Sequence, residues 1–301
     1  MNNLKLHKFK NIELTDDMKV ILDEMIRSVK NDKAVYEYVK SIGINNDELL
    51  ENNIASISEY KDDQDYCMKC PGYLNCAKHH AHYVIKLEYN GKFLSKKYSV
   101  CPLKIEDLEK NKMFIIRDFP ASWRVSTLQT MDKSKVRSGV IKKYKEASTS
   151  NKNWIYITGS HRSGKSFVAA TLLNRFIEDR KQKAVFINYP LRVRDLQDLS
   201  FSNKEDFISL INLYSSVDLL VMDDFGNEYK SEYIRDSITL AILNERARRG
   251  LVTIFTSMFS YAELESMYSL NYSGRARGKQ LVNLLNDFAG EPVDITTAAI
   301  Y

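Results

Sequence analysis

One stretch of this 301-residue chain, residues 154–166, restricts the possible folds more than any other. It opens with an apolar run, residues 154–157, which predicts a buried strand of a parallel sheet. A glycine, four further residues, a second glycine, a lysine and a serine follow, and a helical pattern begins near Lys165. A strand, this spacing and a helix together predict a loop that wraps around phosphate groups, within an α/β fold.

Phosphate binding explains each residue type in this loop. Gly159 and Gly164 allow the backbone N–H groups to point inward at phosphate oxygens. Lys165 would reach the β- and γ-phosphates, and the Ser166 hydroxyl would bind Mg²⁺. We therefore expect ATP and Mg²⁺ as ligands. The predicted ATP-binding residues are Gly159, Ser160, His161, Arg162, Ser163, Gly164, Lys165 and Ser166.

A second element of the same chemistry follows at residues 218–224. Four apolar residues, 219–222, are followed directly by Asp223 and Asp224. At the end of a buried strand, Asp223 can hold Mg²⁺ through water, and Asp224 can orient or deprotonate an attacking water. These two are the predicted catalytic residues, and Glu228 is a weaker candidate for the same work as Asp224.

Strand and helix patterns alternate through the C-terminal half of the chain. Residues 184–188, 253–257 and 292–296 read as strands, whereas residues 234–249 and 280–288 read as helices. This alternation predicts a doubly wound parallel sheet with the site at the carboxyl edge of its strands.

The N-terminal part contains all four cysteines of the chain. Three amphipathic helices are predicted first, from Thr15, near residues 35–42 and over residues 47–60. A cysteine cluster then begins with two cysteines that are separated by two residues. An Asn-Gly hairpin would bring the last cysteine back to this cluster. This pattern predicts a closed structural Zn²⁺ site rather than four reduced core cysteines. The candidate ligands are Cys67, Cys70, Cys76 and Cys101, with His82 as an alternative to one of them.

Length and charge indicate a division of the chain. We predict a helical, zinc-binding domain over residues 1–110, basic linker helices over 111–150 and an ATPase domain over 151–301. Residues 111–150 hold 9 Lys and Arg against 3 Asp and Glu, which indicates either a solvated linker or a contact with nucleic acid or an acidic partner. Arg192, Arg194 and the arginines within residues 246–249 are further candidate DNA contacts.

The sequence offers no secretory signal and no apolar run of about 20 residues, which is the length needed to span a membrane. We therefore expect a cytoplasmic protein in a reducing compartment, with no membrane partner.

Taken together, these motifs resemble those of the bacterial replicative helicase loaders of the DnaC/DnaI kind, the primosomal loaders of Gram-positive bacteria. The resemblance is carried by residues 159–167, 221–228, 233–236 and 254–264 and by the cysteine cluster. It implies an AAA+ ATPase fold that lacks most of the C-terminal lid. It also implies an N-terminal zinc domain that binds the hexameric replicative helicase, and ATP-tuned binding to single-stranded DNA while the helicase is loaded. Self-assembly on the helicase and contacts with other primosome proteins would follow.

Two features depart from the family pattern: one residue and one helix. Met258 stands where the family usually has asparagine, and Thr256 or Ser257 could compensate. The family's late helix usually carries arginines that reach a neighbouring subunit's nucleotide. Here that helix is apolar, so Arg275 and Arg277 in the preceding loop are the nearest candidates, unless they are only surface charge. ATP hydrolysis is therefore expected to be slow or dependent on a partner.

Two other classes share parts of this pattern. A transposition helper ATPase would share the ATPase half, but the near-neutral N-terminal part argues against a DNA-binding head. A small-molecule kinase would need a lid with arginines over its acceptor, whereas the pair Asp223 and Asp224 suits a water nucleophile.

Overall fold

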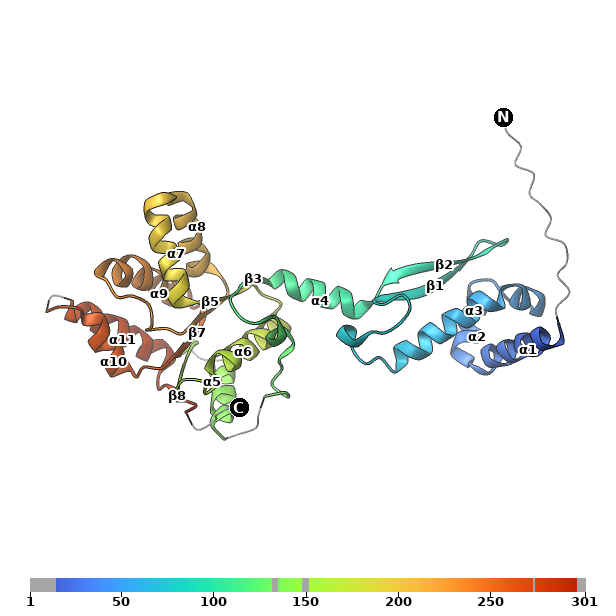
Figure 1. The fold of residues 1–301 in the computed structure, drawn as a ribbon, viewed down its shortest axis with the longest axis horizontal. Helices are drawn as coiled ribbons and strands as arrows, with labels where there is room; N and C mark the ends of the chain where they lie inside the picture. The colour runs from blue at the N-terminus through green and yellow to red at the C-terminus, as the bar shows by residue number, and fades with distance from the viewer. Residues whose placement is uncertain (1–14, 132–134, 148–151, 273, 297–301) are drawn as a thin grey trace, which may run out of the picture. The chain divides into compact units, whose positions relative to one another are not determined.

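The computed structural model describes residues 15–131, 135–147, 152–272 and 274–296 (Figure 1). The chain divides between Leu108 and Glu109 into two compact units. Within the described residues, none of the helices combines the length and the apolar character that a membrane crossing requires.

The first unit consists of three helices and a β-hairpin. The helices are α1 (Asp16–Asn31), α2 (Lys33–Ser41) and α3 (Asp47–Met68), and a short 3₁₀ turn, η1 (Tyr73–Asn75), follows. The hairpin pairs β1 (Tyr83–Tyr89) with β2 (Leu94–Val100) in antiparallel register. The three predicted helices and the hairpin are confirmed, although α3 continues past its predicted end at residue 60. Thr15 caps α1 as predicted, because its hydroxyl accepts the backbone N–H of Met18 at 3.4 Å.

One face of the hairpin closes the core of this unit. Val39 and Ile57 of the helices and Ile85 and Leu87 of β1 are all buried in one apolar cluster. The Tyr38 hydroxyl bonds both the backbone N–H and the carbonyl of Leu87, each at 3.2 Å. These two hydrogen bonds fix the position of β1 relative to α2.

The second unit is built on a six-stranded sheet in which every neighbouring pair is parallel. The prediction of a parallel sheet is confirmed. Its order is β3 (Phe114–Arg117), β5 (Ala184–Asn188), β6 (Leu219–Asp223), β7 (Val252–Ser257), β4 (Trp154–Thr158) and β8 (Val293–Asp294). The edge strand β3 corrects the expectation that residues 111–150 form only linker helices, because this strand extends the sheet beside β5.

Alternation along the buried strands separates two apolar cores. In β4, Trp154 and Tyr156 enter one core, whereas Ile155 and Ile157 enter the other. The helices that flank the sheet form two groups, one for each face (Figure 1). One core is covered by α7 (Tyr189–Ser202), α8 (Lys204–Ser216), the π-helical turn η3 (Ile234–Thr239), α9 (Leu240–Arg249), α10 (Tyr261–Ser269) and α11 (Arg275–Ala289), and the other by α5 (Lys135–Ala147) and α6 (Lys165–Arg180).

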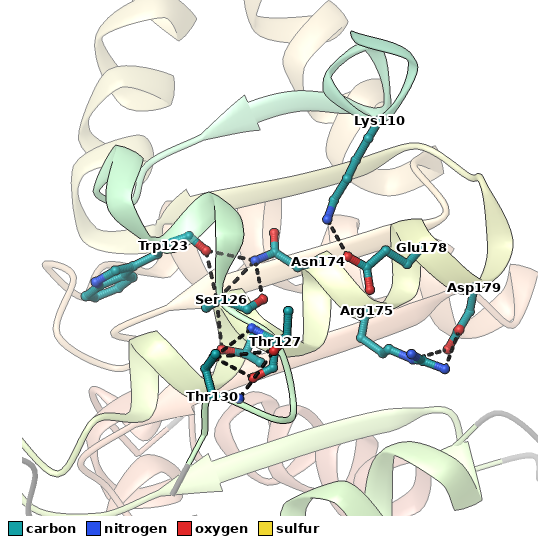
Figure 2. A network of polar contacts seen from close by, with 10 residues as sticks. Lys110, Trp123, Ser126, Thr127, Thr130, Asn174, Arg175, Glu178 and Asp179 are labelled. Carbon is teal, nitrogen blue, oxygen red and sulfur yellow. Dashed lines mark hydrogen bonds and ion pairs between the residues drawn. The ribbon is translucent and has the colours of Figure 1, made fainter. Parts of the chain in front are cut away.

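The segment before α5 is fastened along α6 (Figure 2). This segment includes the end of α4 (Pro102–Met113) and the 3₁₀ turn η2 (Ala121–Val125). The buried Asn174 amide donates to the carbonyls of Trp123 at 2.8 Å and of Ser126 at 3.0 Å. The Thr171 hydroxyl lies 2.9 Å from the Ser126 hydroxyl. The segment is thereby held against the helix that begins at the predicted phosphate loop.

Arg246 of α9 is a structural residue and not a surface cation. Its guanidinium is fully buried and donates to the carbonyls of Tyr214 and Val217, each at 2.8 Å, and of Val252 at 2.6 Å. It also donates to the Thr253 hydroxyl at 2.9 Å. Burial lowers the pKa of Arg246 to about 9. The expectation that Arg246 could touch DNA is wrong, because the side chain lies inside the core and joins α8, α9 and β7.

We predict that Arg246→Met lowers the free energy of unfolding by about 3 kcal/mol, because three buried carbonyls lose their donor. Denaturant unfolding followed by tryptophan fluorescence measures this, since both tryptophans, Trp123 and Trp154, lie in the second unit. Arg248→Met is the matched control. Arg248 is exposed on the same helix, and in the described part of the chain its ion-pair partner is Glu245, so its loss should leave the unfolding midpoint nearly unchanged. Equal losses in the two variants would contradict the assignment.

Candidate nucleotide-binding site

The loop between β4 and α6 has the backbone shape that the glycine spacing predicts. Gly164 adopts φ = 87°, in the left-handed region that favours glycine. Gly159 is constrained by its neighbours instead. A Cβ atom there would lie 2.9 Å from the Ser163 hydroxyl and 3.1 Å from the backbone nitrogen of Thr296. The loop thus closes tightly before the first turn of α6, where the helix dipole favours negative charge.

Lys165 is folded back over this loop. Its ammonium donates to the carbonyl of Gly159 at 2.8 Å and to that of Ser160 at 2.7 Å. The residue is only 8% exposed, and burial lowers the pKa of the ammonium, whereas Asp224 and Asp223 raise it. A buried cation held by two neutral carbonyls is a strong attractor for phosphate oxygens. Beside it, the buried Ser163 hydroxyl has no hydrogen-bond partner within the described part of the chain.

Asp223 ends β6 and faces the start of α6. Its carboxylate accepts the Thr256 hydroxyl at 2.5 Å, and the Ser166 hydroxyl lies near enough to act on its pKa. Burial raises the pKa of this carboxyl, and the two hydroxyls lower it. The structure therefore brings together Ser166 and Asp223, the two residues predicted to bind Mg²⁺. A buried carboxylate next to a hydroxyl suits a divalent cation.

Asp224 leaves the strand in an unusual conformation. Its φ of 62° is in the left-handed region, and its backbone N–H donates to the Thr256 hydroxyl at 2.9 Å. The Asn227 amide bonds its carboxylate at 2.5 Å. The single hydroxyl of Thr256 therefore contacts both acids, and it fixes the point at which the chain turns from Asp223 to Asp224.

From the sequence, Thr256 is expected to lie at the polar end of a buried strand facing the γ-phosphate, and to substitute for an asparagine at position 258; its contact with the two acids is not predicted. Its contact with the acids comes from its place near the end of β7, beside β6 in the sheet. Polar residues at the end of an otherwise apolar strand were the signal available for it. Ser257 is engaged elsewhere, because its hydroxyl donates to the Phe225 carbonyl at 2.7 Å. Met258 follows the strand and is 43% exposed.

Glu228, the weaker candidate for activating water, is not available for that role. The residue is 3% exposed, and one carboxylate oxygen accepts the backbone N–H of Gly226 at 2.9 Å. The other oxygen accepts the hydroxyl of Tyr268. Both oxygens are used inside the core, so Asp223 and Asp224 are the two predicted acids that share the Thr256 hydroxyl.

The two predicted trans arginines lie on a helix and not in a loop. The helix α11 starts at Arg275, earlier than the predicted residue 280, so Arg275 and Arg277 occupy its first turn. Both are exposed. Arg275 lies over the Tyr272 ring at 5.1 Å from its centroid, and Arg277 donates to the Gln280 side chain at 2.9 Å.

The four cysteines lie in the first unit, between the end of α3 and the start of α4. The hairpin returns Cys101 to the start of β1 as expected, because its N–H donates to the His82 carbonyl at 2.9 Å. Backbone hydrogen bonds from His82 and Lys78 lower the pKa of the Cys76 thiol. The Lys78 ammonium lies 3.3 Å from the Cys67 sulfur and 2.6 Å from the Asp63 carboxylate.

These thiols do not form a ligand set as they stand. Among the residues described, no group of three or more His, Cys, Asp or Glu side chains is placed to hold a metal ion. Cys70 is exposed, and a lysine occupies the space beside Cys67. The His82 ring nitrogen lies 3.1 Å from the carbonyl of Tyr73. The zinc prediction stays a prediction.

Comparison with known proteins covers most of the chain. It is 24% identical over 285 residues to the replicative helicase loader DnaI of Bacillus subtilis (strain 168), with 89% of each chain covered. This chain resembles a replicative helicase loader. The resemblance expected from the motifs is thus confirmed. No family model matches the chain.

The fold agrees with this likeness to DnaI. A crystal structure of DnaI superimposes with a TM-score of 0.54 and 20% identity, covering 62% of this chain and 98% of that chain. The α/β fold with its parallel sheet is therefore shared with that DnaI structure.

We predict that Lys165→Ala weakens ATP binding about a hundredfold or more, because a buried charge-assisted contact to phosphate is lost. Titration with a fluorescent ATP analogue measures the change. Lys145→Ala removes an exposed lysine of α5 and should leave the affinity unchanged. Unaltered ATP affinity in Lys165→Ala would contradict the assignment of the loop.

Proposed function

We propose that this protein loads a hexameric replicative DNA helicase during primosome assembly, with ATP as the switch. The observation that carries the proposal is the joint presence of two features. The second unit contains a phosphate loop facing an acid pair, and the likeness to DnaI extends over 89% of the chain. A loop for nucleotide alone would fit many ATPases, and the likeness across both units supports the helicase loader among them.

The ATP site is assigned to residues 159–166 with Asp223 and Asp224. The loop N–H groups and Lys165 bind the phosphates, while Ser166 and Asp223 hold Mg²⁺, which neutralises phosphate charge when bound. Asp224 orients the attacking water. Thr256 sets the positions of both acids but offers no side-chain amide to the γ-phosphate, and Met258 offers none either. This supports slow or partner-stimulated hydrolysis to ADP and phosphate, with Arg275 and Arg277 as candidates to act on a neighbouring copy.

We assign helicase binding to the first unit and single-stranded DNA binding to the second unit. Residues 111–150 carry the basic excess of the chain, and Arg194 of α7 is an exposed cation of the second unit. Arg192 is less suited to DNA, because its guanidinium makes a two-bond ion pair with Asp118. Assembly of several copies on the helicase, in the cytoplasm and with other primosome proteins, completes the proposal.

A transposition helper ATPase remains the alternative for the second unit alone. It would require the first unit to recognise DNA or a transposase. The likeness to DnaI covers 89% of the chain and so includes most of the first unit, which favours the helicase loader.

We expect the full chain to co-purify with a purified hexameric replicative helicase in the presence of ATP and Mg²⁺. Size-exclusion chromatography with light scattering would give the stoichiometry. The experiment is repeated with ADP and with the Lys165→Ala variant, which should reduce or change the complex. A chain that binds ATP but gives no complex with the helicase under any nucleotide would overturn the loader assignment.

The zinc site is part of this proposal. Four thiols of Cys67, Cys70, Cys76 and Cys101, at the end of a helix and the base of a hairpin, are the donor set that Zn²⁺ prefers. Binding would require Lys78 to leave the Cys67 sulfur and the thiols to move together. We predict one zinc per chain by mass spectrometry under native conditions, lost in Cys67→Ser. Purified protein without zinc, folded and able to bind helicase, would show that the thiols are structural cysteines only.

A further inference from the structure

A buried polar cluster lies next to the acid pair, and none of its members has a role in nucleotide binding. Its centre is Glu228, whose side chain is fully buried. The carboxylate accepts the N–H of Gly226 at 2.9 Å and the hydroxyl of Tyr268, and it lies 3.7 Å from the Lys230 ammonium. A buried carboxylate is strongly unfavourable unless donors surround it. Here two donors and a cation converge on one side chain.

The cluster braces the turn that carries Asp224. The N–H of Asn227 donates to the Asp224 carbonyl at 3.2 Å, which closes the turn. Inside it, Gly226 has φ = 95°, and a Cβ atom there would lie 2.7 Å from the Phe259 ring and 2.8 Å from Leu264. The turn therefore has one permitted shape, and Glu228 binds its central N–H.

Tyr268 anchors the turn to a different element. It lies near the end of α10, its ring stacks on Phe225 at a centroid distance of 5.9 Å, and it is fully buried. Its carbonyl accepts the Arg235 guanidinium at 3.0 Å. The Tyr268 hydroxyl is thus the one donor to Glu228 that comes from α10, in the described part of the chain.

We propose that Glu228, held by Tyr268, is a positioning residue that fixes the orientation of Asp224 toward the attacking water. It acts through the backbone of the turn and touches neither the phosphate loop nor Asp223. This inference rests on the proposed ATP hydrolysis. It also explains why Glu228, an acid four residues beyond Asp224, is buried and not directed at the site.

The test compares two tyrosines of α10 in the full chain. Tyr268→Phe removes the hydroxyl that binds Glu228 and keeps the ring stacking. Tyr261→Phe removes a hydroxyl of the same helix that donates to the Gly290 carbonyl at 2.9 Å; among the described residues, this hydroxyl has no hydrogen bond to the turn. Glu228→Gln is a second variant that keeps the side-chain shape. ATP affinity and the single-turnover rate of hydrolysis are measured for each variant. The rate of Asp224→Asn, which lacks the water-orienting carboxylate, serves as the lower reference.

We expect Tyr268→Phe and Glu228→Gln to lower the single-turnover rate about tenfold while ATP affinity stays within about twofold, because the displaced group acts only in the transition state. Tyr261→Phe should match the wild type in both measurements. Hydrogen exchange of the 224–230 backbone should rise in Tyr268→Phe and not in Tyr261→Phe.

Three results would overturn the inference. These are a wild-type rate in Tyr268→Phe, equal rate losses in the two tyrosine variants, and a loss of ATP affinity that accounts for the slower rate. Failure of the proposed function looks different. A wild-type chain that binds no ATP, or that binds it and never hydrolyses it, would overturn the ATPase assignment itself, whatever the variants do.

Discussion

The parallel pairing of β4, β7 and β6 is the constraint on which the second unit depends. These strands are covered on both faces, so their side chains must be almost entirely apolar along their length. Polar groups can then appear only where the strands end. Because parallel strands end at the same edge, residues far apart in sequence meet there: the phosphate loop after β4, Asp223 at the end of β6 and Thr256 near the end of β7.

At that edge the polar groups form one connected set. The Thr256 hydroxyl contacts both the Asp223 carboxylate and the backbone N–H of Asp224, the Ser166 hydroxyl lies near Asp223, and Lys165 binds two carbonyls of the phosphate loop. We expect the two acids to be held rigidly, because the buried Thr256 hydroxyl donates to Asp223 and accepts from the backbone of Asp224. A nucleotide entering it would meet donors and acids already in place, and small changes in the turn after β6 would move the water-orienting acid.

The first unit follows a different principle. Its core is small and is completed only when β1 packs on the three helices through the bonds of Tyr38. A core of this size is stabilised further by an additional cross-link, such as a bound metal ion. The buried ion pair of Lys78 and Asp63, with its contact to Cys67, stabilises this region in the structure. Bound zinc would have to replace part of that arrangement.

The sequence by itself determined the parallel α/β fold, most helix and strand positions and the residues of the phosphate loop. It could do so because strand burial, helical periodicity and the glycine spacing are local properties of the chain. It did not find β3, since a four-residue edge strand in a basic segment carries almost no periodic signal. Nor did it show that Arg246 is buried or that Glu228 faces away from the site. Those outcomes depend on which partners the tertiary structure supplies: three backbone carbonyls around the arginine, and the hydroxyl of Tyr268 and the N–H of Gly226 around the glutamate. A charged side chain becomes structural or functional according to the donors and acceptors that folding brings to it, and only the folded chain decides this.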